Sequence, residues 1–184
     1  MSTQQYSERH LAMLIDGDNA QHKFIKEILE EVSRYGTTTY RRAYGDWTQP
    51  NLAGWRDVMQ ESAIDPIHKW RSVNGKNATD IDLTINAMEI LYTGKVQGFC
   101  IVSSDSDFTG LCMKIRDAGL FVMGIGEKKT PKPFVNACDV FLYVEDIIQP
   151  KKPPQQQTPT IPSIATKKPK DAIDILRHAF DISA

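Results

Sequence analysis

Short apolar runs alternate with longer stretches of helical periodicity along most of this 184-residue chain, and this alternation constrains the fold more than any other feature. Runs rich in aliphatic, β-branched and aromatic residues predict strands at 11–15, 37–44, 64–70, 99–102, 121–125 and 140–144. Apolar residues at helical spacing predict helices at 20–35, 50–62, 79–92, 107–118 and 132–137. Strands and helices that alternate in this way predict an α/β domain with a central parallel sheet and helices on both faces.

Glycine and proline mark the ends of several of these elements. Gly36 is expected to cap the C-terminus of the first helix, and Pro50 suits the start of the second. Pro66 indicates that the strand at 64–70 lies at an edge or begins irregularly, because proline cannot donate a hydrogen bond to a neighbouring strand.

The composition of the chain changes near residue 149. Residues 1–148 are expected to form the folded domain, whereas residues 149–169 are rich in Pro, Gln and Lys and predict a linker. Residues 170–184 predict an amphipathic helix that docks on the domain or begins a further module, because one such helix cannot bury its apolar stripe alone.

The formal net charge of −1 and the pI near 6.4 exclude a protein that coats nucleic acid non-specifically, although they do not exclude a nuclease. No apolar run approaches the roughly 20 residues of a membrane-spanning helix. The polar segment 1–10 has no signal-peptide pattern. We therefore expect a cytoplasmic protein without a membrane partner.

Pairs of aspartates stand where the expected strands give way to helices. They are Asp16 and Asp18, Asp80 and Asp82, and Asp105 and Asp107. Ligands of such sheets bind outside the carboxyl ends of the strands. Grouped carboxylates repel one another and lose solvation, so they need a positive partner. Mg²⁺ or Mn²⁺ with oxygen ligands meets this need and supports phosphodiester cleavage.

Each pair also has a structural alternative. The D-G-D-N run at 16–19 is typical of a turn, in which Asp18 or Asn19 could cap the next helix. Thr79-x-x-Asp82 resembles a capping box, which would leave Asp80 as the metal ligand of that pair. The residues before 107 are Ser and Asp, the preferred N-caps of helices.

Further polar residues accompany the acids. Ser103 or Ser104 could bond a phosphate oxygen or hold an acid in place, and Asn19 could orient a carboxylate or a water. Lys76 could neutralise the acids or hold a scissile phosphate. Basic residues also gather at other places, where they either contact RNA or form a solvated surface: Arg41 and Arg42; Lys69, Arg71 and Lys76; Lys128, Lys129 and Lys132; and the lysines near the C-terminus.

Several ordered motifs resemble those of NYN domains in the PIN-like nuclease superfamily, in particular the bacterial LabA-like (DUF88) group. The motifs are LIDGDNA (14–20), YGDW (44–47), KNATDIDL (76–83), VSSDSDF (102–108) and GEKKTPKPFVNACDVF (126–141). The resemblance covers roughly residues 8 to 147 and implies a Rossmann-like central parallel sheet with an acidic pocket for Mg²⁺ or Mn²⁺. It implies an endonuclease that hydrolyses RNA, usually single-stranded.

The resemblance assigns roles to the acids by motif. Asp16 matches the acid that ends the first strand, and Asp80 matches the acid of the K-x-x-x-D helix start. Asp105 and Asp107 match the paired acids of S-x-D-x-D-F, while Asp18 and Asn19 complete the first motif. Asp16, Asp80, Asp105 and Asp107 are thus the expected catalytic residues, and these four with Asp18 are the expected metal ligands.

The chain departs from the family pattern at two positions. Gly17 stands where close relatives are expected to have Ala, a change between small residues that is not expected to disturb the pocket. Asp82 stands where relatives usually have an uncharged residue, and is either an additional ligand or a cap. Relatives often continue into an OST-HTH (LOTUS) module. The Lys-rich linker and the amphipathic helix near the C-terminus of this chain resemble the segment that leads into such a module.

The expected function is therefore metal-dependent cleavage of RNA by an endoribonuclease. A phosphatase of the haloacid dehalogenase type is one alternative, because Asp16-x-Asp18 after a strand resembles its nucleophile motif. A non-catalytic RNA-binding or scaffold module is the other. Self-association and a protein or RNA partner at the C-terminal segment are both compatible with the sequence.

Overall fold

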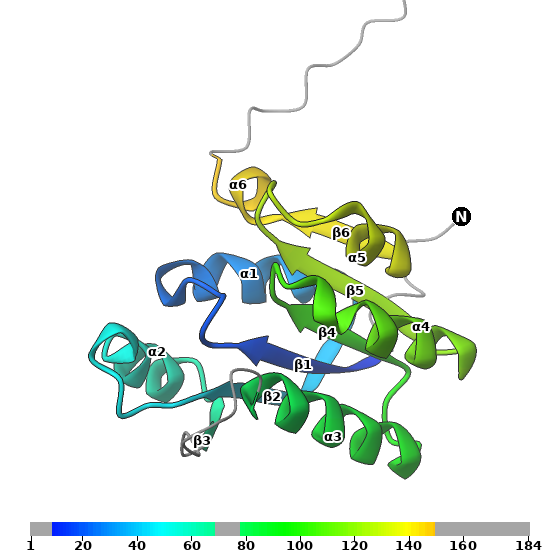
Figure 1. Cartoon of the computed structure of the whole chain (residues 1–184), viewed down its shortest axis with the longest axis horizontal. Helices are drawn as coiled ribbons and strands as arrows, with labels where there is room; N and C mark the ends of the chain where they lie inside the picture. Colours follow the sequence, from blue (N-terminus) through cyan, green and yellow to red (C-terminus); the bar gives the residue numbers. More distant parts are fainter. Residues whose placement is uncertain (1–8, 69–77, 150–184) are drawn as a thin grey trace, which may run out of the picture. The chain divides into compact units, whose positions relative to one another are not determined.

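The computed structural model describes residues 9–68 and 78–149 (Figure 1). The strands are β1 (His10–Asp16), β2 (Thr37–Gly45), β3 (Asp65–His68), β4 (Gly98–Val102), β5 (Phe121–Gly126) and β6 (Val140–Tyr143). The α-helices are α1 (Ile25–Val32), α2 (Trp55–Glu61), α3 (Ala78–Thr93), α4 (Thr109–Asp117), α5 (Lys132–Ala137) and α6 (Val144–Ile147). Short 3₁₀ helices precede three of them: η2 (His22–Phe24), η3 (Pro50–Leu52) and η4 (Ser106–Phe108).

The strands form one sheet in the order β3-β2-β1-β4-β5-β6, and all neighbours are parallel. The strand β1 lies between β2 and β4, and its residues from Leu11 to Asp16 are fully buried. A strand that is covered on both faces consists almost entirely of apolar residues, which is why the sequence predicts a strand at 11–15. The strand order reverses between β1 and β4, since the chain first extends the sheet on one side and then returns to the other.

Helices cover both faces of the sheet, as the sequence predicts (Figure 1). Ala12 and Leu14 of β1 pack in a core with side chains of α3, α4 and α5. Leu11, Met13 and Ile15 point to the other face, where they pack with α1 and α2. Asp16 continues the first alternation, because successive side chains of a strand point to opposite faces. Its carboxylate therefore lies on the side of α3 and α4.

Most predicted elements are present, with differences at their ends. The helix expected at 20–35 is shorter, because η2 precedes α1 and the chain leaves the helix after Val32 through hydrogen bonds typical of a 3₁₀ turn. The expected strand at 140–144 ends at Tyr143, and α6, which the sequence did not predict, begins at the next residue. A helix of four residues is too short to show a periodicity.

The prediction that Gly36 caps the first helix was wrong. Among the described residues, the glycines with positive φ are Gly94 and Gly119. Gly36 is instead required by close packing, since a Cβ there would lie 2.3 Å from the carbonyl oxygen of Arg9. The prediction for Pro66 was correct, because in the described part of the chain β3 pairs with β2 alone and forms an edge of the sheet.

Some expectations concern residues outside the described part of the chain. They include the linker at 149–169 beyond its first residue, the terminal helix at 170–184, and Lys76. Within 9–68 and 78–149, no helix has both the length and the apolar character needed to span a membrane.

Candidate metal centre

The acidic residues meet above the carboxyl ends of β1 and β4, at the point where the strand order reverses. Asp16 is the last residue of β1, and Ser103 directly follows β4, its neighbour in the sheet. A crevice forms at such a point because the connections from the two strands leave in opposite directions, and ligands of open α/β sheets bind there. The position of the acids in the fold is therefore that of a binding site.

Asp16 is fully buried, and four hydrogen bonds hold its carboxylate. Its Oδ1 accepts from the backbone N–H groups of Asp18 and Asn19, at 3.2 and 3.3 Å. Its Oδ2 accepts from Asn19 Nδ2 and from Ser103 Oγ, both at 2.7 Å. Burial raises the pKa of Asp16, while the hydrogen bonds from Ser103 and Asn19 oppose this rise. Asn19 thus orients a carboxylate, one of the two roles expected for it.

Ser103 connects Asp16 to the second acidic motif. While its Oγ donates to Asp16, the same atom accepts from the backbone N–H of Asp105 at 3.0 Å. The neighbouring Ser104 accepts from the backbone N–H of Glu127, at 2.9 Å, and so ties the loop after β4 to the end of β5. The geometry of Ser103 fits the role of holding an acid in place, while a contact of either serine with a phosphate stays a prediction.

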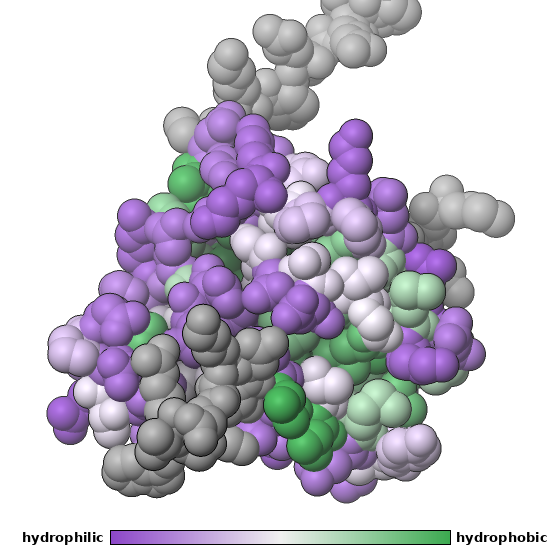
Figure 2. Space-filling view, in the orientation of Figure 1, coloured by the Kyte–Doolittle hydropathy of each residue, from purple (hydrophilic) through white to green (hydrophobic). Residues whose placement is uncertain are grey.

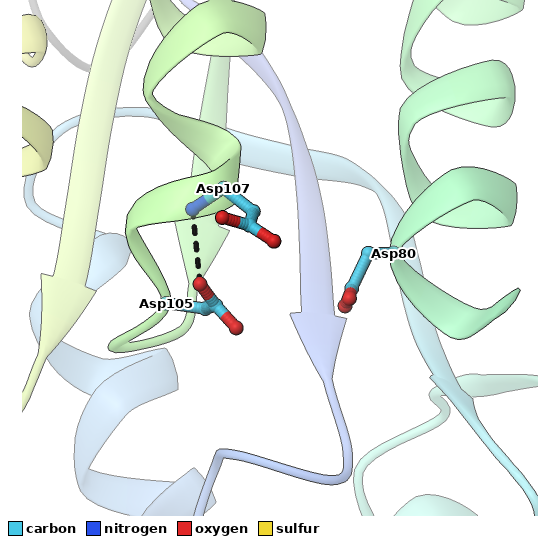
Figure 3. Close-up of side chains that lie close together, drawn as sticks. All are labelled: Asp80, Asp105 and Asp107. Carbon is cyan, nitrogen blue, oxygen red and sulfur yellow. Dashed lines mark hydrogen bonds between the residues drawn. The ribbon is translucent and has the colours of Figure 1, made fainter. Parts of the chain in front are cut away.

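Asp80, Asp105 and Asp107 form the candidate metal centre (Figure 3). Each offers one carboxylate oxygen, and these three atoms lie within 4.8 Å of one another. Asp80 comes from the first turn of α3, and the other two come from the start of η4 on the opposite side of the crevice. Asp105 also caps η4, because its Oδ1 accepts from the N–H of Asp107 at 2.9 Å. The capping role and the metal-binding role predicted for Asp105 are therefore compatible.

Burial and the neighbouring acids together raise the pKa of Asp80. Burial is the largest cause of the perturbation, and the negative charges of Asp16, Asp105, Asp107 and Asp18 add to it, so that its pKa rises to about 6. A carboxylate in this position would be stabilised by a positive charge among the acids. Aspartate oxygens are hard ligands, which suit divalent cations such as Mg²⁺ and Mn²⁺ better than softer metals. The donor set therefore fits a divalent cation.

The prediction of a capping box at Thr79 was wrong. The helix α3 begins at Ala78, so Thr79 lies inside its first turn, and its Oγ1 donates to Asp18 Oδ2 at 3.1 Å. Asp18 thereby links the loop after β1 to the start of the helix that holds Asp80. Asp82 is not part of the group of three carboxylates, because residues two apart on a helix point in different directions.

Gly17 lies in a tightly packed part of the loop after β1. A Cβ at this position would lie 2.7 Å from Cη2 of Trp47 and 2.8 Å from the carbonyl oxygen of Tyr44. The indole of Trp47 is itself held by a hydrogen bond from Nε1 to the carbonyl of Ile67, at 3.2 Å. Trp47 and the β2 backbone thus close over the loop that begins at Asp16, while the expectation that Gly in place of Ala leaves the pocket undisturbed stays a prediction.

Several residues of the basic clusters in the described part of the chain are engaged with other groups. Arg42 bonds Asn86 and lies 3.7 Å from Asp65. Lys128 pairs with Asp146 and Lys129 with Glu127, each at 2.8 Å. These contacts fit a surface role for the clusters. The sequence did not reveal Thr79 and Trp47 as supports of the acidic loop, since neither belongs to a pattern that predicts such a contact.

The fold and the acidic crevice together define a PIN-like domain of the nuclease type. The chain belongs to the NYN domain family, whose model matches residues 10–145. NYN domains are part of the PIN-like nuclease superfamily. The match includes every acid of the crevice, and the resemblance seen in the sequence is thereby confirmed at the level of the family. Membership of the LabA-like group stays a prediction.

A solved structure supports the fold of this chain. A protein of unknown function from Vibrio parahaemolyticus RIMD 2210633 has a TM-score of 0.64 at 18% identity, over 76% of this chain and 95% of that chain. A periplasmic solute-binding protein of an ABC transporter from Actinobacillus succinogenes 130z, solved with D-allose, has a TM-score of 0.36 at 17% identity, over 74% of this chain and 38% of that chain. The first structure supports the fold of this chain and nothing about its function. The second is too different in structure to support either. No curated protein matches this chain in sequence.

Proposed function

We propose that the chain is a metal-dependent endoribonuclease that uses Mg²⁺ or Mn²⁺ to hydrolyse phosphodiester bonds of single-stranded RNA. The observation that carries this proposal is the group of carboxylates of Asp80, Asp105 and Asp107, each with an oxygen within 4.8 Å of the others. The group lies at the switch point of the sheet, and the chain belongs to a family of the PIN-like nuclease superfamily. Both facts support phosphodiester chemistry at this site.

In this proposal the three grouped carboxylates hold the cation. Asp18 completes the ligand set directly or through a water, and the buried Asp16 does so through waters. A bound cation would lower the pKa of a water and offset the charge that grows on the phosphate. Asp16 is held by four hydrogen bonds, which fix the position of its carboxylate behind the group. Ser103 fixes the distance between the two acidic motifs, because it bonds both.

The remaining proposed residues contact the substrate. Asn19 is exposed at the mouth of the crevice although its amide also bonds Asp16, and Ser104 is half-buried beside it. Ser103 and Lys76 complete this proposed set. A cation is still needed for RNA to approach, because phosphates and carboxylates repel one another.

The burial of Asp16 argues against a phosphatase of the haloacid dehalogenase type. In that mechanism Asp16 would attack phosphorus as a nucleophile, so one of its oxygens would have to meet the substrate. Both oxygens are instead engaged with donors of the protein, and the side chain is fully buried. Trapping a phosphoaspartate at Asp16 would overturn this reasoning.

The proposal is tested by incubating the protein with a fluorescent single-stranded RNA and a DNA of matched sequence, in Mn²⁺, Mg²⁺ or EDTA. The variant Asp105→Asn removes one charge from the group and keeps a good N-cap for η4. Asp117→Asn is the matched control, because Asp117 lies on the surface at the end of α4, where it pairs with Lys114 at 3.7 Å.

Metal-dependent cleavage of RNA by the wild type and the control, but not by Asp105→Asn, is the expected result. RNA binding that EDTA does not change, without cleavage in any metal, would instead support the non-catalytic RNA-binding module. We also propose that residues 1–148 act as the nuclease domain, followed by a linker at 149–169 and an amphipathic helix at 170–184.

A further inference from the structure

An apolar groove continues from the candidate metal centre along α3. It lies between the first turns of α3 and the segment that begins α4, and it has a volume of about 250 Å³. Its lining residues are Asp80, Ile81, Thr84, Ile85, Asp107 and Phe108. Two of these, Asp80 and Asp107, belong to the metal centre as well. The groove and the metal centre are therefore one continuous surface.

The groove exposes isoleucine side chains next to charged groups. The exposed fraction is 57% for Ile81 and 49% for Ile85, which lie one turn apart on α3. The same helix buries Leu83, Ala87 and Ile90 on its inner side, so the two isoleucines do not serve the core. Figure 2 shows strongly hydrophobic surface over α3, beside hydrophilic surface. An isolated exposed isoleucine is unremarkable, but a pair that lines a groove at a binding site indicates a ligand with an apolar face.

The chemistry of the groove selects the kind of group that fits. Its end at Asp80 and Asp107 is negative, so a phosphate cannot occupy it without a cation. A nucleobase is neutral, has flat apolar faces and carries polar groups along its edge. Its face can pack on Ile81 and Ile85, as flipped bases pack on apolar side chains, while its edge meets the hydroxyl of Thr84 and the carboxylates.

We propose that this groove binds one unpaired nucleobase, that of the nucleotide next to the phosphate at the metal centre. The inference rests on the proposed function, because the cation among the acids positions that phosphate. In a duplex both faces of a base are covered by stacking, so the groove accepts only a base from a single strand. The groove therefore supplies a physical reason for a preference for single-stranded RNA.

The test uses the full chain with isoleucines replaced by a small polar residue, Ile81→Ser with Ile85→Ser. The matched control is Tyr92→Ser, since Tyr92 is 81% exposed on the same helix but is not among the residues of the groove. Substrates are a single-stranded RNA and two copies of it that lack the base on one or the other side of the cleaved bond. The readouts are KM and kcat for cleavage, Kd for the same RNAs with Ca²⁺ in place of Mg²⁺ or Mn²⁺ to suppress cleavage, and the molecular mass in solution.

We expect the double variant to raise KM and Kd for ordinary RNA about tenfold, which corresponds to about 1.4 kcal/mol, with kcat little changed. The wild type should bind one of the abasic RNAs as weakly as the variant does, and Tyr92→Ser should behave as wild type. If the variant and the wild type bind all three RNAs equally, the groove does not hold a base. If the variant instead loses self-association, the groove is a contact between copies of the chain and the inference fails.

The experiment separates this inference from the proposed function. If the wild type cleaves RNA and the double isoleucine variant behaves in the same way, the proposed nuclease function stands and the proposed role of the groove is refuted. If the wild type binds RNA without cleaving it and the double variant binds more weakly, the nuclease function is refuted and the role of the groove stands. A wild type that neither cleaves nor binds RNA overturns both.

Discussion

Replacing Asp80 by Asn should stabilise the metal-free protein at neutral pH. The pKa of Asp80 rises from 3.8 to about 6, first through burial and then through the charges of the neighbouring acids. At about 1.36 kcal/mol per pH unit, this difference corresponds to about 3 kcal/mol of destabilisation when Asp80 is ionised. Asp80 is only half-buried, so water screens part of the repulsion, and we expect about 1–2 kcal/mol. The melting temperature should rise by roughly 3–8 °C.

The same reasoning sets the dependence on pH. Because the pKa of Asp80 is higher in the folded protein than in the unfolded chain, the folded state binds the proton more tightly. The destabilisation is therefore complete above pH 6 and disappears as the pH falls from 6 towards 3.8. The advantage of Asp80→Asn should be about half as large at pH 5 as at pH 7.5.

Thermal melts in EDTA at pH 5 and pH 7.5 measure this effect for the wild type, Asp80→Asn and Asp117→Asn. The control variant should melt within roughly 1–2 °C of the wild type at both pH values, because an exposed ion pair contributes little. The reasoning is refuted if Asp80→Asn is no more stable than the wild type at pH 7.5. It is also refuted if the gain is the same at both pH values, because a titrating carboxylate would then not be its cause.

Further variants and conditions test the other parts of the site. Asp105→Asn should abolish RNA cleavage while circular dichroism and melting in EDTA show a folded protein at least as stable as the wild type; full activity at normal stability would contradict its assignment. Mn²⁺ should raise the melting temperature of the wild type more than that of Asp105→Asn, because a ligand stabilises the folded state that binds it more tightly. An equal rise would show that Mn²⁺ does not bind at the acidic group. Gly17→Ala should cost about 1–3 kcal/mol in chemical denaturation because its Cβ would contact Trp47, and an unchanged midpoint would show that the loop yields easily. Ser103→Ala should cost about 1–2 kcal/mol and, since it removes a hydrogen bond that lowers the pKa of Asp16, should move the acidic limit of activity to higher pH; a pH–rate profile that coincides with the wild type would contradict this.

The course of the backbone could be predicted from local patterns. The strands β1 and β4 are covered on both faces, so nearly every residue in them is apolar and the pattern is unambiguous. The prediction and the structure differ where an element is short, as for α6. They also differ where residues distant in sequence determine the local conformation, as for Gly36. The carbonyl of Arg9 that excludes a side chain at Gly36 lies 27 positions earlier in the chain, and no local pattern reports such a contact.

The sequence by itself determined where each acid stands along the chain, because the ends of apolar runs are visible in it. It also determined the family, since the acidic motifs occur in order and residues 10–145 match the family model. These are properties of short segments, and short segments can be interpreted without knowing what packs against them.

Only the tertiary structure decided which acids share a site and how each is used. Asp80 and Asp105 are 25 positions apart, and the packing of α3 against β1 and η4 brings an oxygen of each within 4.8 Å of the other. Asp16 stands at an equally clear strand end, yet packing buries it among four hydrogen bonds and leaves it outside that group of three. The physical reason is that burial, electrostatic repulsion and hydrogen bonding depend on distances in space, which the packing of helices on the sheet sets.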